Sequence, residues 1–307
     1  MNLRDLAYLI ALADHRSFRL AAEVCNVSQP TLSTQIRRLE EELGVALFER
    51  APRNLILTPA GEAAVRRARR IHDELRQMRD EASGHGAEGL TQLHLGVFPT
   101  LGPYLLPHIL PGLTARFPKL ALKLTEEKSA ELLAQLIDGR LDAVILGQRV
   151  EDAHVTGTPL FREPFRLAVP AAHPLAGQPR VAASDLAGQK LMLLEEGHCL
   201  RDQALDLCRQ SGAEEYDGFR GTSLETLRHM VMAGMGLTLM PALACLHPLG
   251  QPQIAAPAFA EPDLGRDIGL YWRKSTTHGA LMQDIAGLMR AQIRDLLAPA
   301  APPAGKA

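Results

Sequence analysis

The chain has 307 residues, which is enough for two or three domains of ordinary size, and its formal net charge at pH 7 is −2. This charge gives no support for nucleic-acid binding, and the first 80 residues, with 13 Arg, no Lys and 11 Asp plus Glu, reach only +2. No stretch approaches the roughly 18 uninterrupted apolar residues of a membrane-spanning helix, so we expect a cytoplasmic protein with no membrane partner. Four cysteines are too few for a disulfide-built scaffold, and a disulfide among them in a reducing cytoplasm is expected to be transient.

Three short helices are predicted at the N-terminus. Apolar residues recur at helical spacing over Leu3–Ala13 and again over Phe18–Cys25. Ser28 is a good N-terminal cap for a third helix, whose first turn tolerates Pro30 and which ends at Gly44. Cys25 is expected to be a small apolar filler on the buried side of the second helix.

The third helix is predicted to have one apolar and one polar face. Short hydrogen-bonding groups followed by guanidinium groups suit contacts to base edges and phosphates when a helix N-terminus enters a major groove. Two short strands are predicted within residues 47–58, and the turn between them could place an arginine in a neighbouring minor groove. The candidate DNA-contacting residues are Ser28, Gln29, Pro30, Thr31, Ser33, Thr34, Arg37 and Arg53.

A long helix is predicted to begin at Thr58-Pro59 and to reach about Ser83, a span of roughly 37 Å. A helix this long and exposed needs a partner. Its arginines at 66, 67, 69 and 70 could follow a phosphate backbone, but we favour a solvated face balanced by Asp73 and Glu74. The glycines of residues 84–89 are expected to form a hinge.

From Leu93 onward short apolar strands alternate with helices, which predicts an α/β domain with parallel strands. The predicted strands are Leu93–Val97, Leu120–Leu124, Ala143–Leu146, Arg166–Val169, Lys190–Leu194, Leu237–Met240 and Ile268–Tyr271. The predicted helices are Tyr104–Phe117, Ala130–Asp138, Arg201–Gln210, Leu224–Ala233 and Leu281–Leu297. The tail from Ala298, rich in Pro and Ala, is expected to be disordered.

Several motifs of the N-terminal part resemble the winged helix-turn-helix of LysR-type regulators. They are Ser17–Ala22, Val27–Ser33, Leu39–Glu40, Leu43–Gly44, Leu47–Arg50 and Leu57–Gly61. The resemblance covers nearly the whole chain, because the linker helix and a two-lobed domain follow in the expected order. Within this family, the peroxide-sensing members are similar in Pro99–Thr100, Gly102–Pro107, Gly197–Ala204 with Cys208, and Thr222–Arg228.

The resemblance implies a fold class and a division into domains. An N-terminal all-α winged helix-turn-helix domain would occupy residues 1–58, and a linker helix and hinge for dimerisation residues 59–89. An α/β regulatory domain, periplasmic-binding-protein-like with two lobes, would follow at 90–298, before a tail at 299–307. Lobe I would span about 90–162 plus 267–298, and lobe II about 163–266.

The resemblance also implies partners. These are promoter double-stranded DNA, RNA polymerase, hydrogen peroxide as the signal, glutaredoxin or thioredoxin as the reductant, and further copies of the chain in a homodimer to homotetramer. No cofactor is expected. A zinc site built on His198, Cys199 and Cys208 is not expected either, because their spacing offers no obvious fourth ligand.

The two cysteines would take the roles of matching residues in the peroxide-sensing members, Cys199 as the peroxidatic and Cys208 as the resolving thiol. On one continuous helix their Cα atoms would be about 13 Å apart, whereas a disulfide needs roughly 4.4–6.8 Å. Oxidation would therefore remodel the local structure. Because thiolate is the nucleophile, we expect His198, Arg201 and the positive end of a helix to favour the anion of Cys199.

The same resemblance assigns a peroxide pocket. Thr100 would orient peroxide through its hydroxyl, His198 and Asp202 would support the hydrogen-bond network, and Arg266 would lie near the pocket. The family pattern has threonine where this chain has Ser129, which keeps the hydroxyl and loses a methyl group.

Three functions compete at this point. The first is a peroxide-responsive regulator of antioxidant genes. The second is a LysR-type regulator whose cleft between the lobes binds a small organic ligand, with incidental cysteines. The third is a thiol peroxidase, for which a DNA-reading domain would be superfluous. We favour the first and expect no enzyme.

Overall fold

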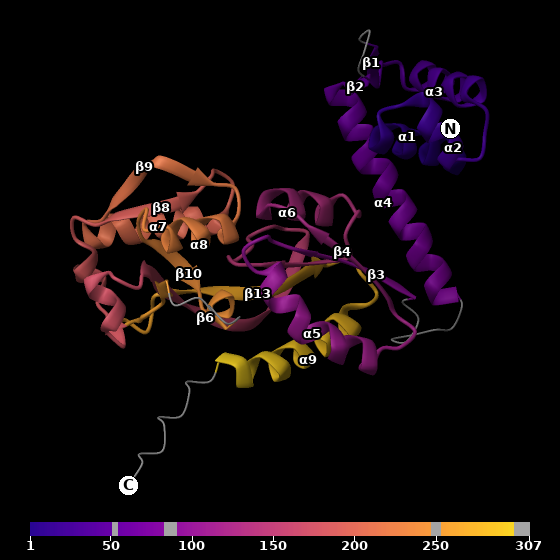
Figure 1. Ribbon diagram of the computed structural model, residues 1–307. Coiled ribbons are helices and arrows are strands. Elements are labelled where there is room, and N and C mark those ends of the chain that lie inside the picture. Colours follow the sequence, from indigo (N-terminus) through magenta and orange to yellow (C-terminus); the bar gives the residue numbers. More distant parts are fainter. Residues whose placement is uncertain (51–54, 83–90, 247–252, 298–307) are drawn as a thin grey trace. The chain divides into compact units, whose positions relative to one another are not determined.

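The computed structural model describes residues 1–50, 55–82, 91–246 and 253–297 (Figure 1). They divide into two compact units, Met1–Gly89 with Ile137–Arg140, and Leu90–Leu136 with Leu141–Ala307, and each is described by itself. Arg53, the glycine hinge at 84–89 and the tail at 298–307 lie outside the described residues. Among the described helices, none combines the length and the apolar character that a bilayer crossing requires.

The N-terminal unit contains the predicted helices and the predicted pair of short strands. Its elements are α1 (Leu3–His15), α2 (Phe18–Val24), α3 (Gln29–Leu43), β1 (Phe48–Arg50), β2 (Leu55–Leu57) and α4 (Pro59–Ala82). Strands β1 and β2 pair antiparallel, with Phe48 opposite Leu57. The long α4 confirms the predicted helix to within one residue at each end.

Side-chain caps fix the helix starts of this unit. Asn2 accepts from the amides of Arg4 and Asp5 and forms a capping box with Asp5, and Ser28 accepts from the Thr31 amide at 3.3 Å. Gly44 ends α3 at φ +71°, a conformation that favours glycine. The helices then bury one shared apolar core that includes Leu9, Leu12, Leu32, Ile36, Leu39 and Leu47.

The second unit is built on a curled mixed sheet of the order β4-β3-β5-β13-β6-β12-β7, with β10 and β11 also paired to β6. Strands β3, β4 and β5 are parallel, as predicted. Their bounds and those of the other strands are β3 (Gln92–Val97), β4 (Ala121–Glu126), β5 (Ala143–Leu146), β6 (Val155–Pro170), β7 (Arg180–Val181), β10 (Thr238–Pro241), β11 (Ile254–Ala255), β12 (Ala258–Phe259) and β13 (Gly265–Arg273).

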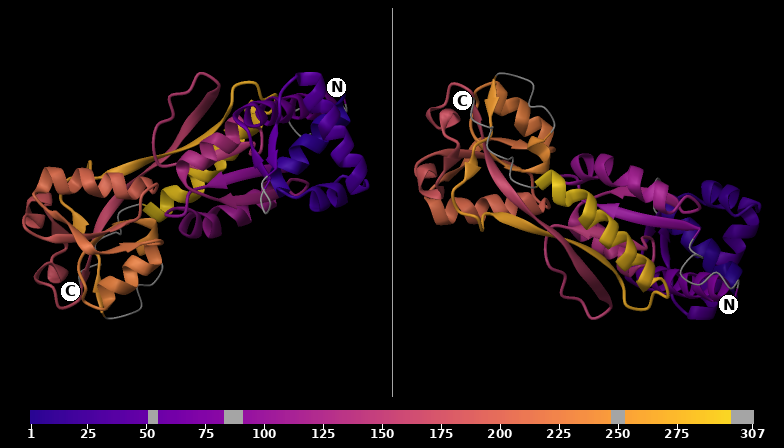
Figure 2. Two further views of the ribbon diagram at one scale, coloured as in Figure 1. Left: turned by 90° about the horizontal axis from the view of Figure 1, so that it is seen from above. Right: turned by 90° about the horizontal axis from the view of Figure 1, so that it is seen from below.

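A separate parallel pair, β8 (Lys190–Leu194) with β9 (Glu214–Gly221), lies in the second lobe. The helices of the unit are α5 (Gly102–Arg116), α6 (Ser129–Ile137), α7 (Cys199–Ser211), α8 (Leu224–Met232) and α9 (Gly279–Leu297), with short 3-10 turns at Pro174–Gly177, Ala183–Leu186 and Leu243–Cys245. In both views of Figure 2 the two lobes lie on either side of the long ladder of β6 and β13. Two extended strands therefore link the lobes.

The sequence prediction misses the first part of one strand, β6, and the whole of four others, β7, β9, β11 and β12. Strand β6 begins at Val155, 11 residues before the predicted start at Arg166, and β9 was not predicted. The missed half of β6 contains Pro159 and Pro164, which argue against a strand by composition. Here Pro159 pairs with Gly269, directly after a register shift in β13, so the proline lies at an irregularity of the ladder.

Candidate functional site

The DNA-facing candidates lie at the start of α3. Ser28, Gln29, Pro30, Thr31, Thr34 and Arg37 are exposed, and Ser33 is half-buried. Three of the hydroxyls are already engaged: Ser28 Oγ lies 2.8 Å from Thr31 Oγ1, and Thr34 Oγ1 donates to the Pro30 carbonyl at 2.9 Å. Among these candidates, Gln29 and Arg37 are exposed and make no side-chain hydrogen bond to the described residues, so their donors suit base edges and phosphates.

A small pocket lies between the two lobes of the second unit. It brings together four of the predicted residues, Thr100, Ser129, His198 and Cys199, and leaves out Asp202, whose side chain is exposed. Segment 98–100 follows β3, Ser129 begins α6 with Lys128 directly before it, and segment 197–199 leads from β8 into α7. The full lining is Phe98, Pro99, Thr100, Lys128, Ser129, Gly197, His198 and Cys199.

Thr100 accepts two hydrogen bonds from a buried arginine that lies outside the pocket lining. Arg266 donates through Nη1 to Thr100 Oγ1 at 2.8 Å and through Nη2 to the Thr100 carbonyl at 2.9 Å. Because the hydroxyl oxygen accepts from the guanidinium, the Thr100 hydroxyl proton is left to donate to another acceptor. Arg266 does not line the pocket and lies 4.9 Å over the ring of Phe98, which does.

The arginine is in turn neutralised by Glu163. Glu163 Oε2 lies 2.8 Å from Arg266 Nη2 and 2.9 Å from Nε, and Oε1 accepts from the Leu243 amide at 2.9 Å. Both side chains are fully buried, with 0% exposure. The pair is therefore completely desolvated and depends on good geometry for its stability. Glu163 was not among the predicted site residues.

Ser129 is buried, and its Oγ has no hydrogen-bond partner among the described residues. A buried hydroxyl without a partner is costly unless a ligand or water satisfies it. Ser129 lines the pocket together with Thr100, so a small polar molecule there would find two hydroxyl groups. The hydroxyl expected at this position is thus present and uncommitted.

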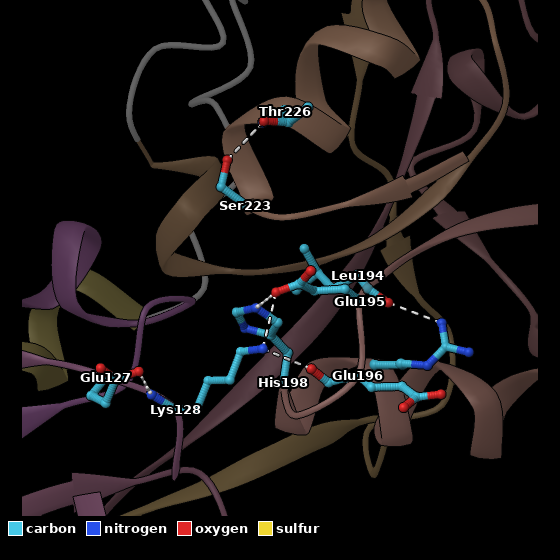
Figure 3. Close-up of polar contacts among 9 residues, drawn as sticks. Glu127, Lys128, Leu194, Glu195, Glu196, His198, Ser223 and Thr226 are labelled. Atoms are coloured by element: carbon cyan, nitrogen blue, oxygen red, sulfur yellow. Dashed lines mark hydrogen bonds and ion pairs between the residues drawn. The ribbon is translucent and has the colours of Figure 1, made fainter. Parts of the chain in front are cut away.

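His198 lies in a cluster that joins the two lobes (Figure 3). Lys128 Nζ donates to Glu195 Oε1 at 2.9 Å and to the Glu196 carbonyl at 2.9 Å, and His198 Nε2 lies 3.9 Å from Glu195 Oε1. Burial, followed by the nearby charge of Lys128, lowers the pKa of His198 from its usual 6.5. His198 is therefore neutral at pH 7.

Cys199 and Cys208 both lie on the single helix α7, and both thiols are free and buried. This is the arrangement for which the sequence predicts Cα atoms about 13 Å apart. Burial, followed by the charge of Glu215, raises the pKa of the Cys208 thiol. The resolving candidate is thus held protonated in this conformation.

The expected support for a Cys199 thiolate needs correction at two residues. Arg201 is committed elsewhere, because it donates to Glu215 at 2.9 and 3.2 Å and to the Leu194 carbonyl at 2.9 Å. His198 carries no charge at pH 7, since its pKa is lowered. Of the three groups expected to favour the thiolate, only the positive end of the helix remains. Cys199 is the first residue of α7, and no described side chain caps that end.

The other cysteines lie outside the pocket. Cys25 is half-buried against the core of the N-terminal unit, as the filler interpretation predicts, and burial raises its pKa. Cys245 donates to the Pro241 carbonyl at 3.5 Å, and burial raises its pKa to about 12. Both thiols are therefore poor nucleophiles at neutral pH.

Comparison with known proteins identifies the class. The model of the LysR substrate binding domain matches residues 86–294, and the model of the bacterial regulatory helix-turn-helix protein of the lysR family matches residues 3–62. Together they cover both units described above. The chain belongs to the LysR family of bacterial transcription regulators.

Within that family the similarity is to OxyR. The chain is 48% identical over 293 residues to the DNA-binding transcriptional dual regulator OxyR of Escherichia coli K12, covering 95% of this chain and 96% of that protein. It is 48% identical over 290 residues to the hydrogen peroxide-inducible genes activator of Pectobacterium carotovorum, covering 94% and 96%. Full-length OxyR from Pseudomonas aeruginosa, a cysteine-to-aspartate variant, superposes with a TM-score of 0.81 at 35% identity, covering 94% and 95%. These relatives are regulators, so the thiol peroxidase interpretation is not supported.

Proposed function

We propose that the chain senses hydrogen peroxide through a reversible disulfide between Cys199 and Cys208 and controls antioxidant genes. The observation that carries this proposal is the pocket, which Cys199 lines together with Thr100 and with Ser129, whose hydroxyl has no partner among the described residues. Two hydroxyl groups beside a thiol suit a small molecule that both donates and accepts hydrogen bonds, as hydrogen peroxide does. The names of the OxyR relatives agree with this choice of signal.

The chemistry runs in two steps. The Cys199 thiolate attacks one peroxide oxygen, the O–O bond breaks, and with one proton taken up the products are a sulfenic acid and water. The Cys208 sulfur then attacks the Cys199 sulfur, and water leaves as the S–S bond forms. Thr100 would donate to peroxide and Ser129 would satisfy its second oxygen, which fixes the O–O bond along the line of attack.

The second step requires a change of shape. About 13 Å of helix separates the two Cα atoms, and a disulfide permits roughly 4.4–6.8 Å, so α7 must lose at least part of its helical structure. A chemical event thereby becomes a conformational change of the regulatory unit. Return to the present conformation would use glutaredoxin or thioredoxin, by attack of an external thiolate on the disulfide.

The N-terminal unit would carry this change to DNA. We infer that α3 enters the major groove of promoter DNA through Gln29 and Arg37, and that α4 pairs two copies of the chain. A homodimer built in this way would assemble further to a homotetramer in the cytoplasm and act on transcription through RNA polymerase.

Peptide mass spectrometry of the full chain before and after brief exposure to dilute peroxide tests the proposal. We expect a linked peptide that joins Cys199 and Cys208 after exposure and its loss on treatment with thioredoxin. Cys199→Ser should abolish both the linkage and the transcriptional response while leaving DNA binding intact. Cys245→Ser is the matched control, because that thiol is half-buried and lies outside the pocket. A response that persists in Cys199→Ser would instead indicate a regulator whose cleft binds an organic ligand.

A further inference from the structure

Lys128 has a position in the pocket that the proposed function does not use. It directly precedes α6 in the first lobe, beside Ser129, and its side chain crosses to the second lobe. There it contacts the Glu195 carboxylate and the Glu196 carbonyl, both at 2.9 Å (Figure 3). These residues form the connection between the end of β8 and the first residue of α7, Cys199.

The Lys128 stem also lies against the next residue of this connection. A Cβ atom placed on Gly197 would lie 2.9 Å from Lys128 Cδ and 3.4 Å from Nζ. The Lys128 side chain therefore lies so close to the backbone of Gly197 that a larger residue there would displace it. Gly197 further adopts φ +90°, which a residue with a Cβ atom rarely does. One lysine from the opposite lobe therefore bonds to residues 195 and 196, and its side chain lies close beside Gly197.

The Lys128 contacts lie at the edge where the two lobes meet around the pocket. Lys128, Gly197, His198 and Cys199 all line it, and only 8% of the Cys199 surface is exposed. Without Lys128, the segment 195–199 would lose charge-assisted bonds that tie it to the wall carrying Ser129. Cys199 would then be less accurately placed for peroxide and more open to larger reagents.

We propose that Lys128 is a positioning residue, which clamps the Glu195–Gly197 segment to the first lobe and so holds Cys199 against Thr100 and Ser129. This inference rests on the proposed peroxide reaction. It predicts opposite effects on two reactions of the same thiol. The peroxide reaction needs the closed arrangement, whereas alkylation by iodoacetamide needs access.

The test uses the full chain in a Cys208→Ser background, in which the Cys199 sulfenic acid is trapped with dimedone and followed by peptide mass spectrometry. Lys128→Met should lower the second-order rate with peroxide by about ten-fold and raise the alkylation rate of Cys199 several-fold. Lys123→Met is the matched control, because it removes the same charge from an exposed position on β4 of the same lobe and should change neither rate.

A partner variant separates the clamp from a general loss of structure. Glu195→Ala should lower the peroxide rate about three-fold, and combining it with Lys128→Met should give no further loss, because the contact is already broken. Equal rates in Lys128→Met and the parent chain overturn the inference. A parallel fall in both reactions also overturns it, since that pattern indicates a change in thiol ionisation.

The peroxide reaction of the parent chain, which carries Cys208→Ser alone, distinguishes failure of the proposed function from failure of the Lys128 inference. If Cys199 of the Cys208→Ser chain does not react with peroxide, the proposed function fails. The alkylation rates of the parent chain and of Lys128→Met then decide the clamp on their own: a several-fold increase supports it and equal rates overturn it.

Discussion

Replacing Glu163 by glutamine removes the only negative charge that contacts the buried guanidinium of Arg266 among the described residues. The amide keeps one oxygen, which can serve either the Leu243 amide or the arginine but not both in the present geometry. Its NH2 group would face a second set of donors. Arg266 would stay buried with its charge uncompensated.

The expected cost is large because both side chains have 0% exposure. Breaking a buried ion pair by changing one partner costs roughly 3–5 kcal/mol of unfolding free energy. For a folded unit of about 150–250 residues, each kcal/mol shifts the melting temperature by roughly 2–4 °C, which gives a loss of ~6–20 °C. The Thr100 hydroxyl, held by the same arginine at 2.8 Å, would also lose its fixed orientation.

Thermal and urea unfolding of the full chain, followed by circular dichroism, measures this loss. Glu151→Gln, at an exposed position, is the control and should change stability by less than about 0.5 kcal/mol. Glu163→Leu combined with Arg266→Met should be more stable than Glu163→Leu alone, because no buried charge is left unpaired. A loss below about 1 kcal/mol in Glu163→Gln, or additive losses in the double variant, would refute the reasoning.

Three further changes test the pocket. Ser129→Ala should leave the unfolding free energy within about 0.5 kcal/mol, because the lost hydroxyl has no partner, yet lower the rate of Cys199 oxidation by peroxide; a large loss of stability would contradict this. Because the pKa of His198 is lowered from 6.5, the unfolded chain binds more protons than the folded chain just below pH 6.5. The free energy of unfolding should therefore fall as the pH is lowered below 6.5. His198→Gln should reduce this pH dependence, measured by urea unfolding at several pH values. Gly197→Ala should cost about 1–3 kcal/mol by thermal unfolding, because φ is +90° and Lys128 Cδ would lie 2.9 Å from the new Cβ.

The fold was predictable where local pattern and burial agree. Strands Ala143–Leu146 and Lys190–Leu194 were predicted with the bounds that the structure has, since each is a short apolar run between turn residues. Strand β9 has the sequence EEYDGFRG, of which only the last residue, Gly221, is buried, so apolar side chains do not alternate along it. It forms because β8 supplies a parallel neighbour, which is a tertiary cause that composition does not reveal.

Site residues could be predicted from the sequence where they belong to a recognisable motif. Residues that contact the site through partners far away in the sequence could not. Thr100, Ser129, His198 and Cys199 do line one pocket. Glu163 lies 103 positions from Arg266, and Lys128 lies 67 positions from Glu195. No local spacing links such residues, because the register of β6 with β13 and the approach of the two lobes bring them together.

The contacts of α7 also explain why a small oxidant could have a large structural effect. The start of this helix is held in two ways: Lys128 bonds to residues 195 and 196, which lead into it, and Arg201 of its first turn bonds to Glu215 and the Leu194 carbonyl. Both sets of contacts belong to the conformation in which α7 is helical and keeps Cys199 apart from Cys208. A disulfide that unwinds the first turn would release them together, and the interaction free energy they supply would favour the return to the dithiol form. The same side chains that place Cys199 for oxidation would thus make the resulting disulfide easier to reduce.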